Sequence, residues 1–250
     1  MNTSSFRFQI TRLGVTSSTM EVMAGAVREN PNLPAFFTIV SDHQMAGRGR
    51  NERIWFDDGS ALLFTTLLRL DAASMNLAAG MCGIAVAGAL EKYGISAQLK
   101  WPNDVLVSGR KIAGILCEHL HVEPGDKHVV AAGIGLNISG VPKPVENQAI
   151  AVKNAAELKL SDEALRTELL REILRELQEV DGLEPEQILA RYAELLAGLG
   201  QETAALLPGD REVHGTICGL GANGALRLRT AGGEVEINVG DIDLVRGRDA

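Results

Sequence analysis

The 250-residue sequence has only three cysteines, 4% aromatic residues and no long apolar run. Cys82, Cys117 and Cys218 lie far apart, each in an apolar or small-residue segment. An odd and scattered set gives no disulfide framework, and no CxxC pair suggests a zinc site. We therefore expect three free, buried thiols. The lack of a long apolar run excludes a membrane-spanning helix, which needs roughly 18 such residues.

A targeting signal and an excess of basic residues are also missing. The first ten residues have neither the basic start nor the apolar stretch of a signal peptide, so we expect a cytoplasmic protein without membrane association. The net charge of −8 argues against general nucleic-acid binding, because phosphate contacts need a basic surface. His119 and His121 alternate on a predicted strand without a third ligand, so the sequence leaves any metal ligands undetermined.

The composition is that of a globular protein, with 46% hydrophobic and 22% charged residues. Ser18 is expected to cap a helix with Glu21 as its capping-box partner. Residues 76–92 predict a buried helix, and Ser161 begins an amphipathic helix that a second helix follows at about 184–196. Short strands and hairpins fill the intervals, which predicts an α+β fold with a mixed sheet flanked by helices. The expected strands cover residues 6–15, 34–41, 61–70, 104–107, 111–121 and 128–138.

The composition changes after residue 200. Residues 203–246 alternate apolar and polar residues between glycine-containing turns. This pattern predicts a small all-β module, most simply an SH3-like barrel. We therefore divide the chain into a larger domain at residues 1–200 and an SH3-like domain at residues 201–250.

The first segment with candidate chemistry is GRGRNERIW at residues 47–55, which follows Gln44 in a long polar loop. Its two glycines let backbone amides approach a ligand closely, and Trp55 offers a flat apolar surface. Its arginines carry donors that match carboxylate and phosphate oxygens: Arg48, Arg50 and Arg53. A merely solvated basic loop is the alternative for this segment alone. The spacing of a Walker A phosphate loop is absent.

Two further segments stand out. In KWPNDVLVSGRKIAG, residues 100–114, Asn103 and Asp104 present polar groups at the start of a strand, and Lys111 places a compact positive charge on the facing strand. An ordinary hairpin with an exposed lysine is the alternative. In GIGLN, residues 133–137, glycines interrupt an apolar strand, which often marks a close approach by a ligand.

Taken together, GRGRxxRxW, KWPND, GRKIAGIL and GIGLN closely resemble the biotin–protein ligase family over nearly the whole chain. The resemblance implies a catalytic domain of the class II aminoacyl-tRNA synthetase and lipoate ligase type at residues 1–200, followed by the SH3-like domain. It also implies an ATP-dependent enzyme that forms biotinyl-5′-AMP, releases pyrophosphate and transfers biotin to a lysine of a carboxylase's biotin carboxyl carrier domain.

The resemblance assigns roles to individual residues. Lys111, Arg48 and Asp104 would be catalytic, with Mg²⁺ near the nucleotide. ATP and the adenylate would contact Arg48, Arg50, Arg53, Trp55, Asn103, Asp104, Lys111, Gly135 and Asn137. Biotin would contact Ser18, Thr19, Met20, Gln44, Gly47, Arg48, Gly49, Arg50, Lys111, Gly114 and Gly133.

The sequence departs from the family pattern at two points. Met20 stands where many relatives have asparagine, so one polar contact to biotin is missing or made by backbone. Some relatives begin with a DNA-binding helix-turn-helix, whereas this sequence starts almost at the catalytic domain, so we expect no nucleic-acid partner. A lipoate or octanoate ligase on the same fold and a non-enzymatic biotin sensor remain as alternatives, and a homodimer remains possible.

Overall fold

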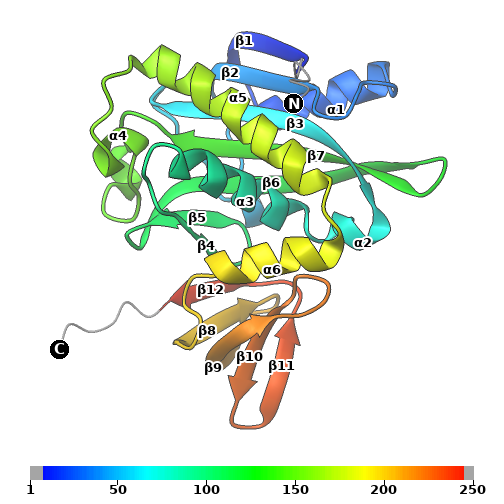
Figure 1. The fold of residues 1–250 in the computed structure, drawn as a ribbon, viewed down its shortest axis with the longest axis vertical. Helices are drawn as coiled ribbons and strands as arrows, with labels where there is room; N and C mark the ends of the chain where they lie inside the picture. Colours follow the sequence, from blue (N-terminus) through cyan, green and yellow to red (C-terminus); the bar gives the residue numbers. More distant parts are fainter. Residues whose placement is uncertain (1–7, 245–250) are drawn as a thin grey trace, which may run out of the picture.

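A seven-stranded mixed sheet forms the larger part of the molecule (Figure 1). The computed structural model describes residues 8–244, apart from the side chain of Glu52. The strand order is β1-β2-β3-β7-β6-β5-β4, and only β1 and β2 are parallel. The strands are β1 (Ile10–Thr16), β2 (Thr38–Gln44), β3 (Ala61–Asp71), β4 (Gln98–Lys100), β5 (Asp104–Val107), β6 (Arg110–Glu123) and β7 (Lys127–Asn137).

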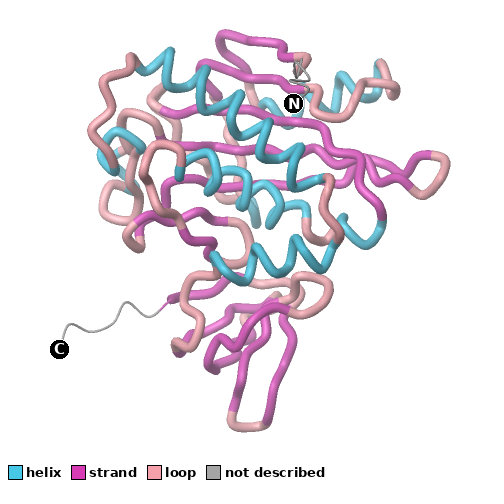
Figure 2. Tube along the Cα trace, viewed as in Figure 1, coloured by secondary structure: helices cyan, strands magenta, loops and turns pink. Residues whose placement is uncertain are grey.

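Helices cover the two faces of this sheet unequally (Figures 1 and 2). One face is covered by α3 and α5, and the main apolar core lies there. On the other face, a smaller core joins α1 to β2, β3 and β7 through Met23, Leu67 and Ala131. The helices are α1 (Thr19–Glu29), α2 (Ala72–Met75), α3 (Ala78–Glu91), α4 (Val152–Ala155), α5 (Asp162–Asp181) and α6 (Pro185–Leu195), with 3₁₀ turns η1 (Arg50–Glu52) and η2 (Lys143–Val145).

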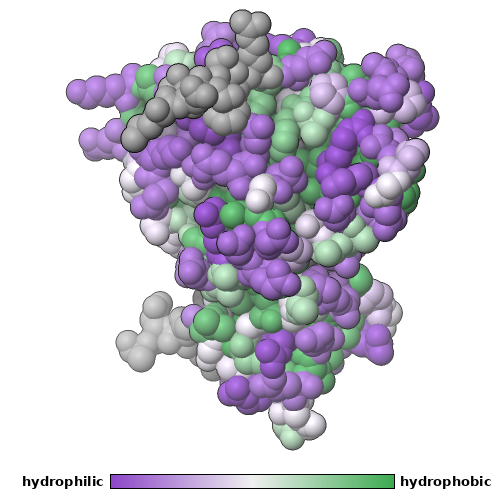
Figure 3. Space-filling model, turned by 45° about the vertical axis from the view of Figure 1, so that its right-hand side comes forward, coloured by the Kyte–Doolittle hydropathy of each residue, from purple (hydrophilic) through white to green (hydrophobic). Residues whose placement is uncertain are grey.

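The C-terminal module is a five-stranded antiparallel sheet in the order β11-β10-β9-β8-β12. Its apolar side chains belong to the same core as those of the larger part. Trp101 donates its indole N–H to the Gly224 carbonyl at 3.0 Å across the junction, which Figure 3 shows as a waist. The strands are β8 (Glu202–Leu207), β9 (Arg211–Leu220), β10 (Leu226–Thr230), β11 (Gly233–Ile237) and β12 (Asp241–Leu244).

Most predicted elements are present, with shifted ends. The strand expected at 34–41 begins only at Thr38, because residues 34–37 form a turn in which Phe36 has a φ of 62°. Ser18 does cap α1, but the capping-box partner was wrong, since Glu21 instead accepts a hydrogen bond from the Ser17 hydroxyl. The N-terminal part of the expected strand at 6–15 and the end of the module lie partly outside the described residues.

The three cysteines are free thiols, but only Cys82 is fully buried. The Cys82 thiol donates a hydrogen bond to Cys117, which together with burial raises the pKa of Cys82 well above its usual value, so this thiol stays protonated and unreactive. Cys117 and Cys218 are half-buried, which corrects the expectation that all three are buried. Within residues 8–244, no helix is long and apolar enough to span a membrane.

The junction of α3 and α6 allows a test of the packing. A Cβ added at Gly80 would lie 2.7 Å from Cδ1 of the buried Tyr192 ring, whereas one added at Gly25 on α1 would meet only the Arg28 side chain at 3.8 Å. We predict that Gly80→Ala lowers the free energy of unfolding by about 1–3 kcal/mol, because the packed ring cannot yield. Gly25→Ala should raise it by about 0.5–1 kcal/mol through helix propensity. Urea unfolding of both variants checks this, and a Gly80→Ala protein as stable as wild type would contradict it.

Candidate active site

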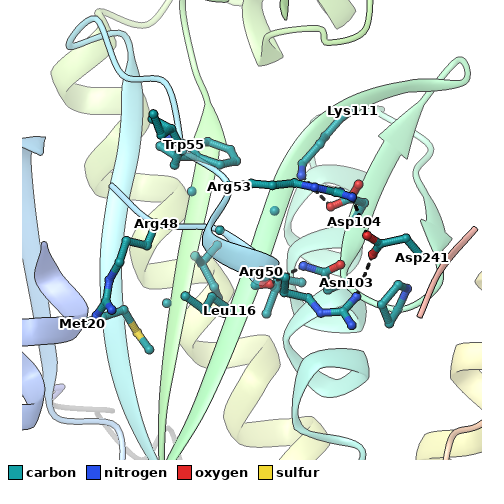
Figure 4. A pocket seen from close by; sticks show the side chains of 18 of the residues that line it. Met20, Arg48, Arg50, Arg53, Trp55, Asn103, Asp104, Lys111, Leu116 and Asp241 are labelled. Atoms are coloured by element: carbon teal, nitrogen blue, oxygen red, sulfur yellow. Dashed lines mark hydrogen bonds and ion pairs between the residues drawn. The ribbon is translucent and has the colours of Figure 1, made fainter. Parts of the chain in front are cut away.

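A cavity of about 380 Å³ opens on the sheet face that α1 covers only in part. Its walls come from α1, the loop between β2 and β3, the β5–β6 hairpin, β7 and the C-terminal strand β12 (Figure 4). One end is polar and buried, the middle is apolar and the opposite end carries charges of both signs. Each region follows from a different local feature of the sequence.

The buried polar end is built by α1 and the end of β2. The Gln44 side-chain oxygen accepts hydrogen bonds from the Thr19 backbone N–H at 2.7 Å and from the Thr19 hydroxyl at 2.9 Å. The hydroxyl of Thr65 on β3 donates to the Thr19 hydroxyl at 2.8 Å. Ser18 and Thr19 are both nearly inaccessible to solvent. A ligand with a small polar ring would find fixed donors and acceptors here, with no bulk water to compete.

The middle of the cavity depends on three glycines in adjacent strands. A Cβ at Gly133 would lie 2.7 Å from Sδ of Met20, and a Cβ at Gly135 would lie 2.6 Å from the Trp55 ring. A Cβ at Gly114 would lie 2.9 Å from both Trp55 and Lys111. Only glycine lets these side chains lie directly against the sheet. An apolar channel results, one wall of which is the Trp55 ring.

The β5–β6 hairpin supplies charges at the opposite end. Lys111 Nζ lies 2.6 Å from Asp104 Oδ1 and 5.6 Å from the centre of the Trp55 ring. The backbone of Lys111 is fixed by hydrogen bonds to Gln148 and Ile150. Asn103 donates its amide to the Ile115 carbonyl at 2.7 Å, which holds the start of the hairpin against β6. The structure thus brings the hairpin's lysine and aspartate together as an ion pair inside the cavity.

The loop arginines are held by carboxylates of other elements. Arg50 lies 3.0 Å and Arg53 2.6 Å from opposite oxygens of Asp241, at the start of β12 (Figure 4). Arg48 points toward Met20 and lies 3.8 Å from Glu21 and 3.9 Å from Glu118. Asp241 therefore joins the C-terminal module to the loop. Sequence reasoning missed it, because Asp241 lies 188 residues after Arg53 in the sequence and no motif links the two.

The cavity gathers nearly all of the residues expected to contact ligand. Gly47 does not line the cavity; within the loop, its carbonyl accepts a hydrogen bond from the Trp55 backbone N–H at 2.9 Å. Asn137 is buried, donates to the Ile150 carbonyl and lines a second groove beside Lys111. The lining residues that sequence reasoning did not identify include Lys100, Leu116, Asp241 and Asp243. The expected residues that do line the cavity are Ser18, Thr19, Met20, Gln44, Arg48, Gly49, Arg50, Arg53, Trp55, Asn103, Asp104, Lys111, Gly114, Gly133 and Gly135.

Within residues 8–244, the histidine side chains do not gather around a common centre. His119 contacts His128 across β6 and β7, with ring nitrogens 3.1 Å apart, and not His121. Within the described part of the chain, no group of three or more histidine, cysteine, aspartate or glutamate side chains is arranged to hold a metal ion.

Two family models match the chain. One, described as the biotin/lipoate A/B protein ligase family, matches residues 13–137, and the other, described as the biotin protein ligase C-terminal domain, matches residues 198–245. The chain belongs to the biotin/lipoate A/B protein ligase family. This confirms the family indicated by the motifs and agrees with a C-terminal sheet of SH3-like type.

Individual relatives of this ligase family cover most of the chain. The bifunctional ligase/repressor BirA of Escherichia coli K12 is 36% identical over 202 residues, which cover 77% of this chain and 61% of BirA. The biotin–[acetyl-CoA-carboxylase] ligase of Paracoccus denitrificans is 29% identical over 230 residues, covering 88% of this chain and 95% of that protein. This chain spans about three fifths of the length of the first curated relatives it matches.

Solved structures confirm the predicted fold. A biotin protein ligase from Aquifex aeolicus in complex with biotin and ATP superposes with a TM-score of 0.75 at 26% identity, covering 96% of this chain and 99% of that one. A biotin protein ligase from Leishmania major in complex with biotinyl-5-AMP superposes with a TM-score of 0.62. The mixed sheet, its flanking helices and the C-terminal sheet are therefore shared with this family.

The contact between the loop and the C-terminal module gives a testable expectation. We predict that Asp241→Asn speeds amide exchange across residues 49–53 of the ligand-free protein roughly threefold to tenfold, because two partly exposed ion pairs are lost. Asp243→Asn is the matched control, since Asp243 lies on the same strand and forms no ion pair within residues 8–244. Equal exchange rates in the two variants would show that Asp241 does not hold the loop.

Proposed function

We propose that this protein is an ATP-dependent biotin–protein ligase. It would activate biotin to biotinyl-5′-AMP with release of pyrophosphate, and then transfer biotin to a lysine of a biotin carboxyl carrier domain. The observation that carries this proposal is the order in which polar, apolar and charged side chains line one cavity. The buried Thr19–Gln44 group, the glycine-floored channel and the Lys111 end match, in that order, a polar ring, an aliphatic chain and a carboxylate.

The charged end explains the first step. A carboxylate that attacks the α-phosphate of ATP brings two anions together, and their repulsion must be cancelled. Lys111 would bind the biotin carboxylate, and Arg50 and Arg53 would offer fixed-fork donors to phosphate oxygens. Arg48, beside Met20, would add a further donor from the same loop. Phosphates would compete with Asp241 for Arg50 and Arg53, so nucleotide binding would exchange one anionic partner of the loop for another.

Magnesium would find a carboxylate ligand in this site, Asp104, which is already paired with Lys111. Asp104 offers a carboxylate inside the cavity beside Asn103, and Mg²⁺ is usually held by one or two carboxylates, phosphates and waters. When bound, the ion would neutralise phosphate charge. Asp104 is also the partner of Lys111, so it would have to turn from the ammonium toward the nucleotide, or serve both.

The second step needs access for a protein lysine. The groove beside the cavity shares Trp55, Asp104 and Lys111 with it, so the reactive acyl group would be reached from that side. Positioning of the amine would supply much of the rate, since an oriented reaction replaces a bimolecular one. We also propose that the acceptor is the carrier domain of a carboxylase, that the protein is cytoplasmic and that it can form a homodimer.

Two other functions use parts of the same site. A lipoate or octanoate ligase would share the fold and the adenylate chemistry, but neither the dithiolane ring of lipoate nor the linear chain of octanoate has N–H or C=O groups for the Thr19–Gln44 group. A non-enzymatic biotin sensor would bind biotin without needing cations for pyrophosphate displacement. The charged end of the cavity therefore favours an enzyme.

Transfer of radiolabelled biotin to an apo carrier domain tests the proposal. We expect ATP-dependent labelling of the carrier, with lipoate in tenfold excess having little effect. Preferential competition by lipoate would indicate a lipoate ligase. Biotin binding without carrier labelling or ATP–pyrophosphate exchange would indicate a sensor.

Removal of the Lys111 ammonium should affect the first step specifically. Losing a charge-assisted contact in a closed site costs about 2–4 kcal/mol of transition-state stabilisation, so we expect Lys111→Ala to slow pyrophosphate exchange by roughly 30-fold to 1000-fold. Lys127→Ala is the control, because Lys127 pairs with Asp71 at the far end of β7. Near-wild-type exchange in Lys111→Ala, with an unchanged melting temperature, would contradict the role of Lys111.

A further inference from the structure

One buried carboxylate joins the two ends of the loop between β2 and β3. Asp57 lies between Trp55 and β3, and its side chain has no solvent-exposed surface. Asp57 Oδ2 accepts a hydrogen bond from the Gln44 backbone N–H at 3.0 Å and lies 2.7 Å from His43 Nδ1. Asp57 Oδ1 accepts from the Gly59 backbone N–H at 2.8 Å. Both ends of the loop that carries the arginines are thus tied to a single side chain.

The sheet explains why a side chain is needed at this place. The antiparallel pairing of β2 with β3 ends at Ser41 and Leu63, so β3 provides no partner for Gln44. The other edge of β2 is paired with β1 as far as Gln44. Asp57 supplies the acceptor that the missing strand would have supplied. Without it, the N–H of Gln44 would be left without a partner, at a cost in free energy.

Gln44 then transmits this constraint to the polar end of the cavity. Its side-chain oxygen accepts from both the N–H and the hydroxyl of Thr19, at the first turn of α1. The Gln44 amide nitrogen is confined on its other side, since a Cβ at Gly47 would lie only 3.3 Å from it. A shift of the Gln44 backbone would therefore displace the acceptor that both donors of Thr19 share, and leave only the Thr65 hydrogen bond to hold the Thr19 hydroxyl.

We propose that Asp57 is a positioning residue for substrate binding: it fixes Gln44 and, through Gln44, orients the Thr19 N–H and hydroxyl at the buried end of the cavity. The identification of the bound polar ring as biotin rests on the proposed function, but the orientation of Thr19 does not. Asp57 does not line the cavity, so it acts only through Gln44 and the loop.

The neighbouring aspartate provides a matched control. Asp58 is exposed and accepts only a local hydrogen bond from the Ser60 N–H at 3.1 Å. Asp57→Asn and Asp58→Asn remove the same charge one residue apart. Asp57→Asn turns one of the two acceptor oxygens into a donor, so Gln44 and Gly59 cannot both keep an acceptor, whereas in Asp58→Asn the remaining oxygen suffices for the Ser60 N–H.

The first experiment needs no ligand. Amide exchange at Thr19 in the ligand-free protein reports its hydrogen bond to Gln44. We expect it to be about tenfold faster in Asp57→Asn and unchanged in Asp58→Asn, with the melting temperature recorded for each. If Asp57→Asn does not fold, Asp57→Ser, whose short hydroxyl cannot reach Gln44 and Gly59 together, takes its place. Unchanged Thr19 exchange in a folded variant would overturn the proposal.

The second experiment is a double-mutant cycle on biotin affinity measured by calorimetry. We expect about tenfold weaker binding in Asp57→Asn, and less than a further twofold loss when the same change is made in Gln44→Ala. Fully additive losses would show that Asp57 does not act through Gln44 and would overturn the positioning role. Absence of biotin binding by the wild-type protein would instead refute the proposed function, and Thr19 exchange would still decide the role of Asp57.

Discussion

The site depends on a part of the sheet that has no side chains on one face. Gly114 and Gly135 lie opposite each other on β6 and β7, and Gly133 follows on the same face. Any side chain there would fill the space now taken by Trp55 and Met20, and no channel would connect the polar and charged ends. The sheet can carry these glycines because α3 and α5 pack its opposite face with fully buried aliphatic residues. The stability of one face thus permits the recognition surface on the other.

The arginines and the tryptophan of the cavity lie on a loop that buries few side chains of its own. The loop between β2 and β3 is fixed at its neck by Asp57 and at its tip by Asp241. The two carboxylates differ in burial, and this difference suits their tasks. The enclosed Asp57 binds main-chain donors that no ligand can satisfy, whereas the Asp241 pairs, with Arg53 largely exposed, are weak enough for a phosphate to replace.

Much of the site could be predicted from the sequence because its parts are local. Gly114 and Lys111 lie on one hairpin, and Arg48 to Trp55 lie on one loop, so their spacing alone carries the chemistry. The pairings of Asp241 and Asp57 could not be predicted in this way. Each pairing depends on where a strand ends or on which distant segments meet, and a single aspartate gives no signal of its partner in the sequence. The same holds for Glu21, whose assigned cap partner was wrong because Ser17 competes for it.

The order of environments also bears on the retention of a reactive intermediate. A mixed anhydride is lost if water reaches it, and the Trp55 ring lies over the channel beside Lys111, where the anhydride would form. The Trp55 indole N–H is buried without a hydrogen-bond partner among the described residues. Such a donor costs free energy unless a ligand atom satisfies it. A ligand that placed an acceptor atom against this indole N–H would remove that cost, and would bind more tightly for it.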